Sequence, residues 1–167
     1  PQKGASPEQI IMLDNQLCLW SDLLKQNTGK DITQLKHGGA AGGITAAMYA
    51  LLNAQLISGS EYCLTLSRFH DNLLQAGVVI TGEGKIDLQS FYGKIPGTVA
   101  NLCQKHNVPV YAVVGLAEKQ VLTRFDKVFI MSQYTRSIQD SIKNAPHYLK
   151  IISQAIVDTL YLSAYSD

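Results

Sequence analysis

The residues best suited to chemistry lie in one stretch, residues 76–96, where an apolar β-branched run gives way to small and charged residues. Residues 78–81 predict a buried strand, and the loop expected after it carries Lys85, Asp87 and Lys94. Open α/β sheets bind ligands at the carboxyl ends of their strands. A carboxylate that accepts a proton and two ammonium groups that attract an anion suit phosphoryl transfer. The alternative is a tight strand-to-helix turn with solvated charges.

A second glycine-rich segment precedes a helix predicted at residues 44–57. Its glycines are Gly38, Gly39, Gly42 and Gly43. Free N–H groups at the start of a helix, together with the positive end of the helix dipole, form a pocket for phosphate or carboxylate. The segment has neither the Gly-Lys-Ser/Thr of a Walker A loop nor the spacing of a dinucleotide-binding fingerprint. Close packing of helices against small residues is the alternative explanation.

The remaining elements alternate between helix and strand. A helix is predicted from Pro7, because Ser6 suits an N-cap and Gln9 completes a capping box, and Gly29 is placed to end it. Further helices are predicted at 60–75, 96–106, 117–124 and 147–164, and further strands at 108–114 and 127–131. This order predicts an α/β fold, a mostly parallel sheet with helices on both faces in a three-layer, Rossmann-like arrangement. We expect one α/β unit over residues 1–167, with hinges near 27–36 and 132–145.

Composition narrows the classes of function. The chain has 167 residues, of which 46% are hydrophobic, enough for the core of one ordinary domain. A net charge of +1 without a basic stripe argues against nucleic-acid binding. No apolar run reaches the roughly 20 residues of a membrane span, and the start does not resemble a signal peptide, so a cytoplasmic location is expected. Cys18, Cys63 and Cys103 are widely spaced, which favours reduced core residues over a disulfide framework or zinc site.

Three stretches resemble the bacterial glycerate kinase family, the two-domain glycerate 2-kinase type. They are residues 1–5, residues 40–43, and residues 81–87 continued by Gln89, Ser90 and residues 93–96. The third stretch is the most specific, since its strand, loop and helix follow in the family's order. The similarity extends over nearly the whole chain, which corresponds to the carboxyl-terminal portion of a much longer family member.

The resemblance implies ATP-dependent phosphorylation of D-glycerate to phosphoglycerate, with ATP and Mg²⁺ as cofactors and glycerate as the small-molecule partner. It implies Asp87 as the base that receives the hydroxyl proton, with Lys85 and Lys94 neutralising the transferred phosphoryl group. Glu83 would orient substrate hydroxyls, and Glu83 or Asp87 is the candidate Mg²⁺ ligand. The implied substrate- and phosphate-binding residues are Gly38, Gly39, Gly42, Gly43, Gly82, Glu83, Gly84, Gln89 and Ser90. For Asp87 the alternative is a helix N-cap.

The chain departs from the family pattern in three ways. His37 stands where the family usually has glycine, and Leu116 where a serine and a longer loop usually follow Gly115. No stretch matches the family's acidic, glycine-containing amino-terminal motif. A second hypothesis is therefore a non-catalytic fragment or divergent relative, a binding or assembly module that requires a partner chain or a missing N-terminal segment. A third is a flavodoxin-like binder of small molecules.

Overall fold

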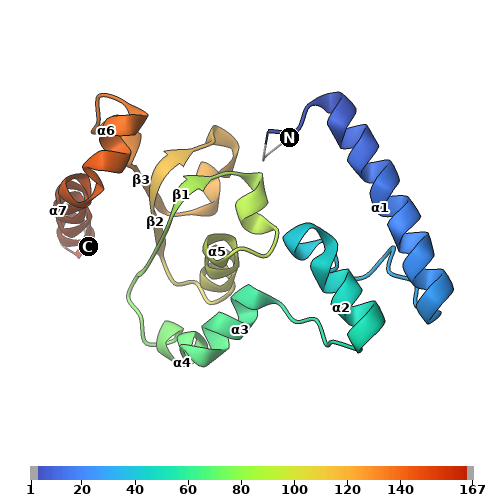
Figure 1. The fold of residues 1–167 in the computed structure, drawn as a ribbon. Coiled ribbons are helices and arrows are strands. Elements are labelled where there is room, and N and C mark those ends of the chain that lie inside the picture. Colours follow the sequence, from blue (N-terminus) through green and yellow to red (C-terminus); the bar gives the residue numbers. More distant parts are fainter. Residues whose placement is uncertain (1–3, 165–167) are drawn as a thin grey trace. The chain divides into compact units, whose positions relative to one another are not determined.

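The computed structural model describes residues 4–164, which belong to two compact units, one up to Ser58 and the other from Gly59 (Figure 1). The resemblance at residues 1–5 falls largely on residues 1–3, which lie outside the described residues. The expectation of a single unit with hinges near 27–36 and 132–145 stays a prediction.

The first unit contains α1 (Pro7–Thr28), a 3₁₀ segment η1 (Ala40–Gly43) and α2 (Ile44–Leu52). Both predicted ends of α1 are confirmed. The Gln9 N–H donates to Ser6 Oγ at 3.3 Å, and the Ser6 N–H donates to Gln9 Oε1 at 2.8 Å, which forms the capping box. Gly29 ends the helix with a φ of 73°. These ends were predictable because capping depends on neighbours in the sequence.

The core of the first unit is small. It consists of Leu24, Ile32, Ala46 and Ala50, with Trp20, Leu35 and Tyr49 packed against it. Helix α2 ends at Leu52 rather than near residue 57, because Asn53 turns left-handed, with a φ of 55°. Two of its three alanines, Ala46 and Ala50, are buried in the core. Its large apolar side chains, Ile44, Met48, Leu51 and Leu52, are exposed and line a groove of about 530 Å³.

The second unit opens with α3 (Gly59–Leu66) and α4 (Phe69–Leu73), which replace the single helix predicted over residues 60–75. The break falls at Arg68, whose φ of 53° is left-handed and ends a regular helix. The elements that follow are β1 (Val79–Ile86), η2 (Leu88–Phe91), α5 (Ile95–Lys105), β2 (Val110–Ala117), η3 (Lys119–Arg124), β3 (Lys127–Ile130), η4 (Met131–Gln133), α6 (Ile138–Lys143) and α7 (Ala145–Ala164).

The three strands of this unit form a parallel sheet in the order β1-β2-β3. Side chains of β2 alternate between its faces. Ala112 and Val114 join the core that includes Cys103 of α5, whereas Tyr111 joins a second core with Ile152 of α7. The sheet therefore has helices on both faces (Figure 1), and the predicted α/β fold is confirmed.

The cysteines differ in environment. Cys103 is buried in the sheet core as predicted, whereas Cys18 and Cys63 are exposed, and all three are free thiols. Burial raises the pKa of the Cys103 thiol to about 11. Of the helices within residues 4–164, none combines the length and the apolar character that crossing a membrane requires.

Candidate active site at the carboxyl end of strand β1

The stretch predicted as a loop after residue 81 is strand, which corrects the sequence interpretation. Gly82 pairs with Val113, and Lys85 with Leu116, as β1 continues to Ile86. The two strands approach so closely that a Cβ on Gly82 would lie 2.5 Å from the carbonyl oxygen of Val113. Glycine is needed there for the pairing of the strands. A Cβ on Gly84 would instead meet open space, so the sheet does not explain that glycine.

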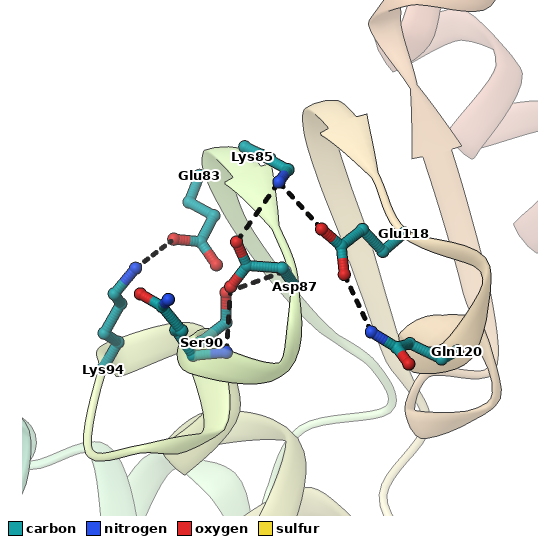
Figure 2. A network of polar contacts seen from close by, with 8 residues as sticks. Glu83, Lys85, Asp87, Ser90, Lys94, Glu118 and Gln120 are labelled. Atoms are coloured by element: carbon teal, nitrogen blue, oxygen red, sulfur yellow. Dashed lines mark hydrogen bonds and ion pairs between the residues drawn. The ribbon is translucent and has the colours of Figure 1, made fainter. Parts of the chain in front are cut away.

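Asp87 follows the last residue of β1 and caps the short helix η2. Its Oδ1 accepts a hydrogen bond from the Gln89 N–H at 2.9 Å, and its own N–H donates to Ser90 Oγ at 3.2 Å. The alternative role of N-cap is thus confirmed. Ser90 is fully buried, whereas 16% of the Asp87 side chain is exposed. The cap uses Oδ1 and leaves Oδ2 directed toward Lys85 (Figure 2).

Lys85 bridges two carboxylates from neighbouring strand ends. Its Nζ lies 2.8 Å from Glu118 Oε1 and 3.5 Å from Asp87 Oδ2. Gln120 donates from Nε2 to the other oxygen of Glu118 at 2.8 Å. Figure 2 shows Lys85 between Asp87 and Glu118, with Gln120 beyond Glu118. The arrangement fixes one cation beside the cap carboxylate.

These contacts change the acidity of the groups involved. Hydrogen bonding and attraction from Glu118, followed by smaller effects of Asp87, raise the pKa of Lys85. The hydrogen bonds from Lys85 and Gln120 lower the pKa of Glu118. Both shifts favour the charged forms, so the ammonium and the carboxylate are ionised at neutral pH.

A second pair lies on the other side of Asp87 (Figure 2). Lys94, the N-cap residue of α5, places its Nζ 3.9 Å from Glu83 Oε2. The other oxygen, Glu83 Oε1, is buried and accepts no hydrogen bond within the described part of the chain. A buried carboxylate oxygen without a donor is costly. This oxygen is therefore suited to accept a hydrogen bond from a substrate hydroxyl or to ligate a hard cation.

The predicted glycine loop belongs to the first unit. Ala41, Gly42 and Gly43 are consecutively left-handed, with φ of 52°, 72° and 96°. The Thr45 hydroxyl lies 2.8 Å from the carbonyl oxygen of His37, which ties the loop to α2. Successive amides in turned conformations form concavities that bind anions. The assignment of Gly38, Gly39, Gly42 and Gly43 to an anion site stays a prediction.

Sequence reasoning missed Glu118 and Gln120. The predicted strands ended at residues 81 and 114, whereas β1 and β2 continue to Ile86 and Ala117, so the position of Glu118 directly after β2 was not apparent from the sequence. Neighbouring parallel strands bring their carboxyl ends to one edge of the sheet. No group of three or more His, Cys, Asp or Glu side chains suited to a metal occurs among residues 4–164. Glu83 and Asp87 remain candidate Mg²⁺ ligands as predictions.

Comparison with known proteins identifies the class. The sequence profile described as the glycerate kinase family matches residues 1–161, and the chain belongs to this family. The stated resemblance is confirmed. The glycerate kinase of Halalkalibacterium halodurans is 43% identical over 115 residues, which are 69% of this chain and 30% of the relative.

Two further proteins extend the comparison. The glycerate 2-kinase of Escherichia coli is 42% identical over 115 residues, which are 69% of this chain and 30% of the relative. A solved structure assigned as glycerate kinase 2 from Salmonella typhimurium LT2 is 36% identical and has a TM-score of 0.61. That match covers 98% of this chain and 43% of the other. The chain thus spans less than half the length of these relatives.

Proposed function

We propose that this chain is the part of a glycerate kinase that supplies the base and two cationic groups for ATP-dependent phosphorylation of D-glycerate. The observation that carries the proposal is the cluster at the end of β1, where Asp87 lies between Lys85 and the Glu83–Lys94 pair. Family membership and the names of the relatives support glycerate as the substrate.

The transfer is a displacement at the γ-phosphorus of ATP. The substrate hydroxyl oxygen bonds to phosphorus, the bond from phosphorus to the bridging oxygen of ADP breaks, and ADP leaves. In our proposal Asp87 Oδ2 receives the hydroxyl proton, because Oδ1 is engaged by the Gln89 N–H. The ammonium groups of Lys85 and Lys94 offset negative charge on the transferred group. The amides of Gly38, Gly39, Gly42 and Gly43 would bind a phosphate or the glycerate carboxylate.

The donor groups suit the Mg²⁺ that kinases of this kind use. Mg²⁺ in phosphate-transfer sites is held by one or two carboxylates together with phosphate oxygens and water. Glu83 Oε1, buried and without a hydrogen-bond donor among the described residues, fits such a ligand and leaves Asp87 Oδ2 to act as the base. Asp87 as the ligand is the alternative. When bound, the cation would neutralise charge on the nucleotide phosphates.

Release of ADP tests the proposal. Purified wild-type protein should release ADP from ATP when D-glycerate is added. Asp87→Asn should lower kcat by about 10²- to 10⁴-fold, the usual contribution of a general base, with a smaller change in KM. Asp158→Asn is the matched control, since Asp158 is an exposed carboxylate on α7, and its kcat should equal that of the wild type. Wild-type kcat in Asp87→Asn would exclude Asp87 as the base, and no ADP release from the wild type would contradict kinase activity.

A further inference from the structure

We propose that Glu118 is a positioning residue that holds Lys85 at the end of β2 and so prevents the ammonium from pairing closely with Asp87 Oδ2. The inference rests on the proposed function, because it assigns Asp87 the role of base. The geometry of three side chains and the backbone that connects them supports it.

The backbone of Glu118 is fixed relative to Lys85. Ile86 pairs with Ala117 in the sheet, and the Glu118 N–H continues the ladder by donating to the Ile86 carbonyl oxygen at 3.0 Å. The Glu118 carbonyl in turn accepts from the Val121 N–H at 3.2 Å, in the first turn of η3. The carboxylate therefore extends from a backbone position that β1 and η3 both hold.

The carboxylate of Glu118 is also held at both of its oxygens. Oε1 lies 2.8 Å from Lys85 Nζ, and Oε2 accepts from Gln120 Nε2 at 2.8 Å. A side chain with both acceptors engaged has few alternative rotamers, so it presents a defined partner to the ammonium.

Asp87 is the weaker of the two partners of Lys85. Its Oδ2 lies 3.5 Å from Nζ, beyond the roughly 2.7–3.2 Å of a normal N–H···O hydrogen bond. A carboxylate oxygen that accepts a short hydrogen bond from an ammonium is occupied by that donor and is less accessible to a substrate hydroxyl. By binding the ammonium itself, Glu118 leaves Asp87 Oδ2 available to a substrate proton while keeping a positive charge nearby.

Five charged groups make up this cluster at the end of β1. They are Glu83 and Lys85 on β1, Asp87 at the start of η2, Lys94 at the start of α5 and Glu118 after β2. Glu83 and Lys94 pair with each other at 3.9 Å. Loss of the Glu118 charge therefore leaves Asp87 as the nearest carboxylate for Lys85.

Glu118→Gln tests this role, since it removes the charge and keeps the shape. In a crystal structure of the variant, the distance from Lys85 Nζ to Asp87 Oδ2 should fall from 3.5 Å to about 2.8 Å, the length of a charge-assisted hydrogen bond. In the active protein kcat should fall roughly tenfold with a smaller change in KM. A merely structural role would not move Lys85 toward Asp87.

Further variants separate the possible outcomes. Glu118→Asp should restore part of kcat, and Gln120→Ala, which keeps both charges, should shift the same quantities less. Asp31→Asn is the matched control, because it removes a comparable exposed pair, Lys25–Asp31 at 2.6 Å, that belongs to the first unit. An unchanged position of Lys85 in Glu118→Gln would overturn the inference, as would a wild-type kcat in that variant. If the wild type releases no ADP, the proposed function fails, and the position of Lys85 in Glu118→Gln alone decides the inference.

Discussion

Two glycine-containing stretches fold for different physical reasons. In the loop before α2, glycine supplies backbone conformation, since Gly42 and Gly43 have φ of 72° and 96°. In β1 glycine supplies proximity, because the extended backbone at Gly82 lies too close to Val113 for a Cβ. Glycine thus allows a left-handed turn in the first unit and a close strand pair in the second.

Each stretch also contains a glycine that the fold does not require. Gly39 has an ordinary φ of −77° and space for a Cβ, and Gly84 has space for a Cβ in an extended strand. Glycine in a strand interior is unfavourable unless a bulge, a bend or a close approach calls for it. These two positions therefore allow the contributions of glycine to stability and to ligand binding to be measured separately.

The largest expected effect is at Gly115, where a Cβ would lie 2.4 Å from the carbonyl oxygen of Gly84. Gly115→Ala must push β2 away from β1, so we expect the free energy of unfolding to fall by about 3 kcal/mol. Urea denaturation followed by circular dichroism measures it. A loss below about 0.5 kcal/mol would show that the strands separate easily and would remove the distinction between the two stretches.

Gly84→Ala is the matched control in the partner strand. We expect no loss of stability, and a gain of about 0.5 kcal/mol, because alanine restricts the unfolded chain without a clash. If a ligand approaches this backbone, the same variant should lower ADP release. Unchanged ADP release would argue that Gly84 does not contact substrate or phosphate.

A smaller effect is expected in the loop of the first unit. Gly43→Ala places a Cβ on a left-handed residue with a φ of 96°, 3.4 Å from the ring of Trp20. The loss should be about 1–2 kcal/mol, the cost of left-handed backbone for an L-residue. The fluorescence of Trp20, the chain's single tryptophan, reports the transition in urea. Gly39→Ala should leave the transition unchanged, and equal losses in both variants would contradict a conformational role.

The sequence could predict structure that depends on neighbouring residues, but not structure that depends on pairing between distant strands. The ends of α1 were predictable, because Ser6, Gln9 and Gly29 act on backbone groups within a few residues of themselves. The extension of β1 through Gly82 and Gly84 was not. Glycine disfavours strands, and the cause of the extension is pairing with residues about 30 positions later in the chain.

The candidate site likewise combines residues that the sequence could predict with residues that it could not. Lys85, Asp87 and Glu83 were predicted together because one strand end carries all three. Glu118 was missed because its contact with Lys85 depends on the register of β1 and β2, in which Ile86 pairs with Ala117.

The smallest expected effect concerns the ion pair Lys85–Glu118. The end of β1 carries charged side chains, whereas residues 38–43 of the glycine loop have none. Because Lys85 and then Gln120 lower the pKa of Glu118 from its ordinary value of 4.5, the folded state releases this proton more readily than the unfolded state. The stabilisation is complete above the unfolded-state pKa and is lost as pH falls through the lower folded-state pKa. It is small, since the pair is exposed and screened by salt.

The urea midpoint should therefore fall more steeply with acid in the wild type than in Glu118→Gln, whereas Gly43→Ala should keep the wild-type slope. Equal slopes in wild type and Glu118→Gln would show that the pair does not contribute to stability, and a changed slope in Gly43→Ala would show that the loop depends on charge as well as on backbone conformation.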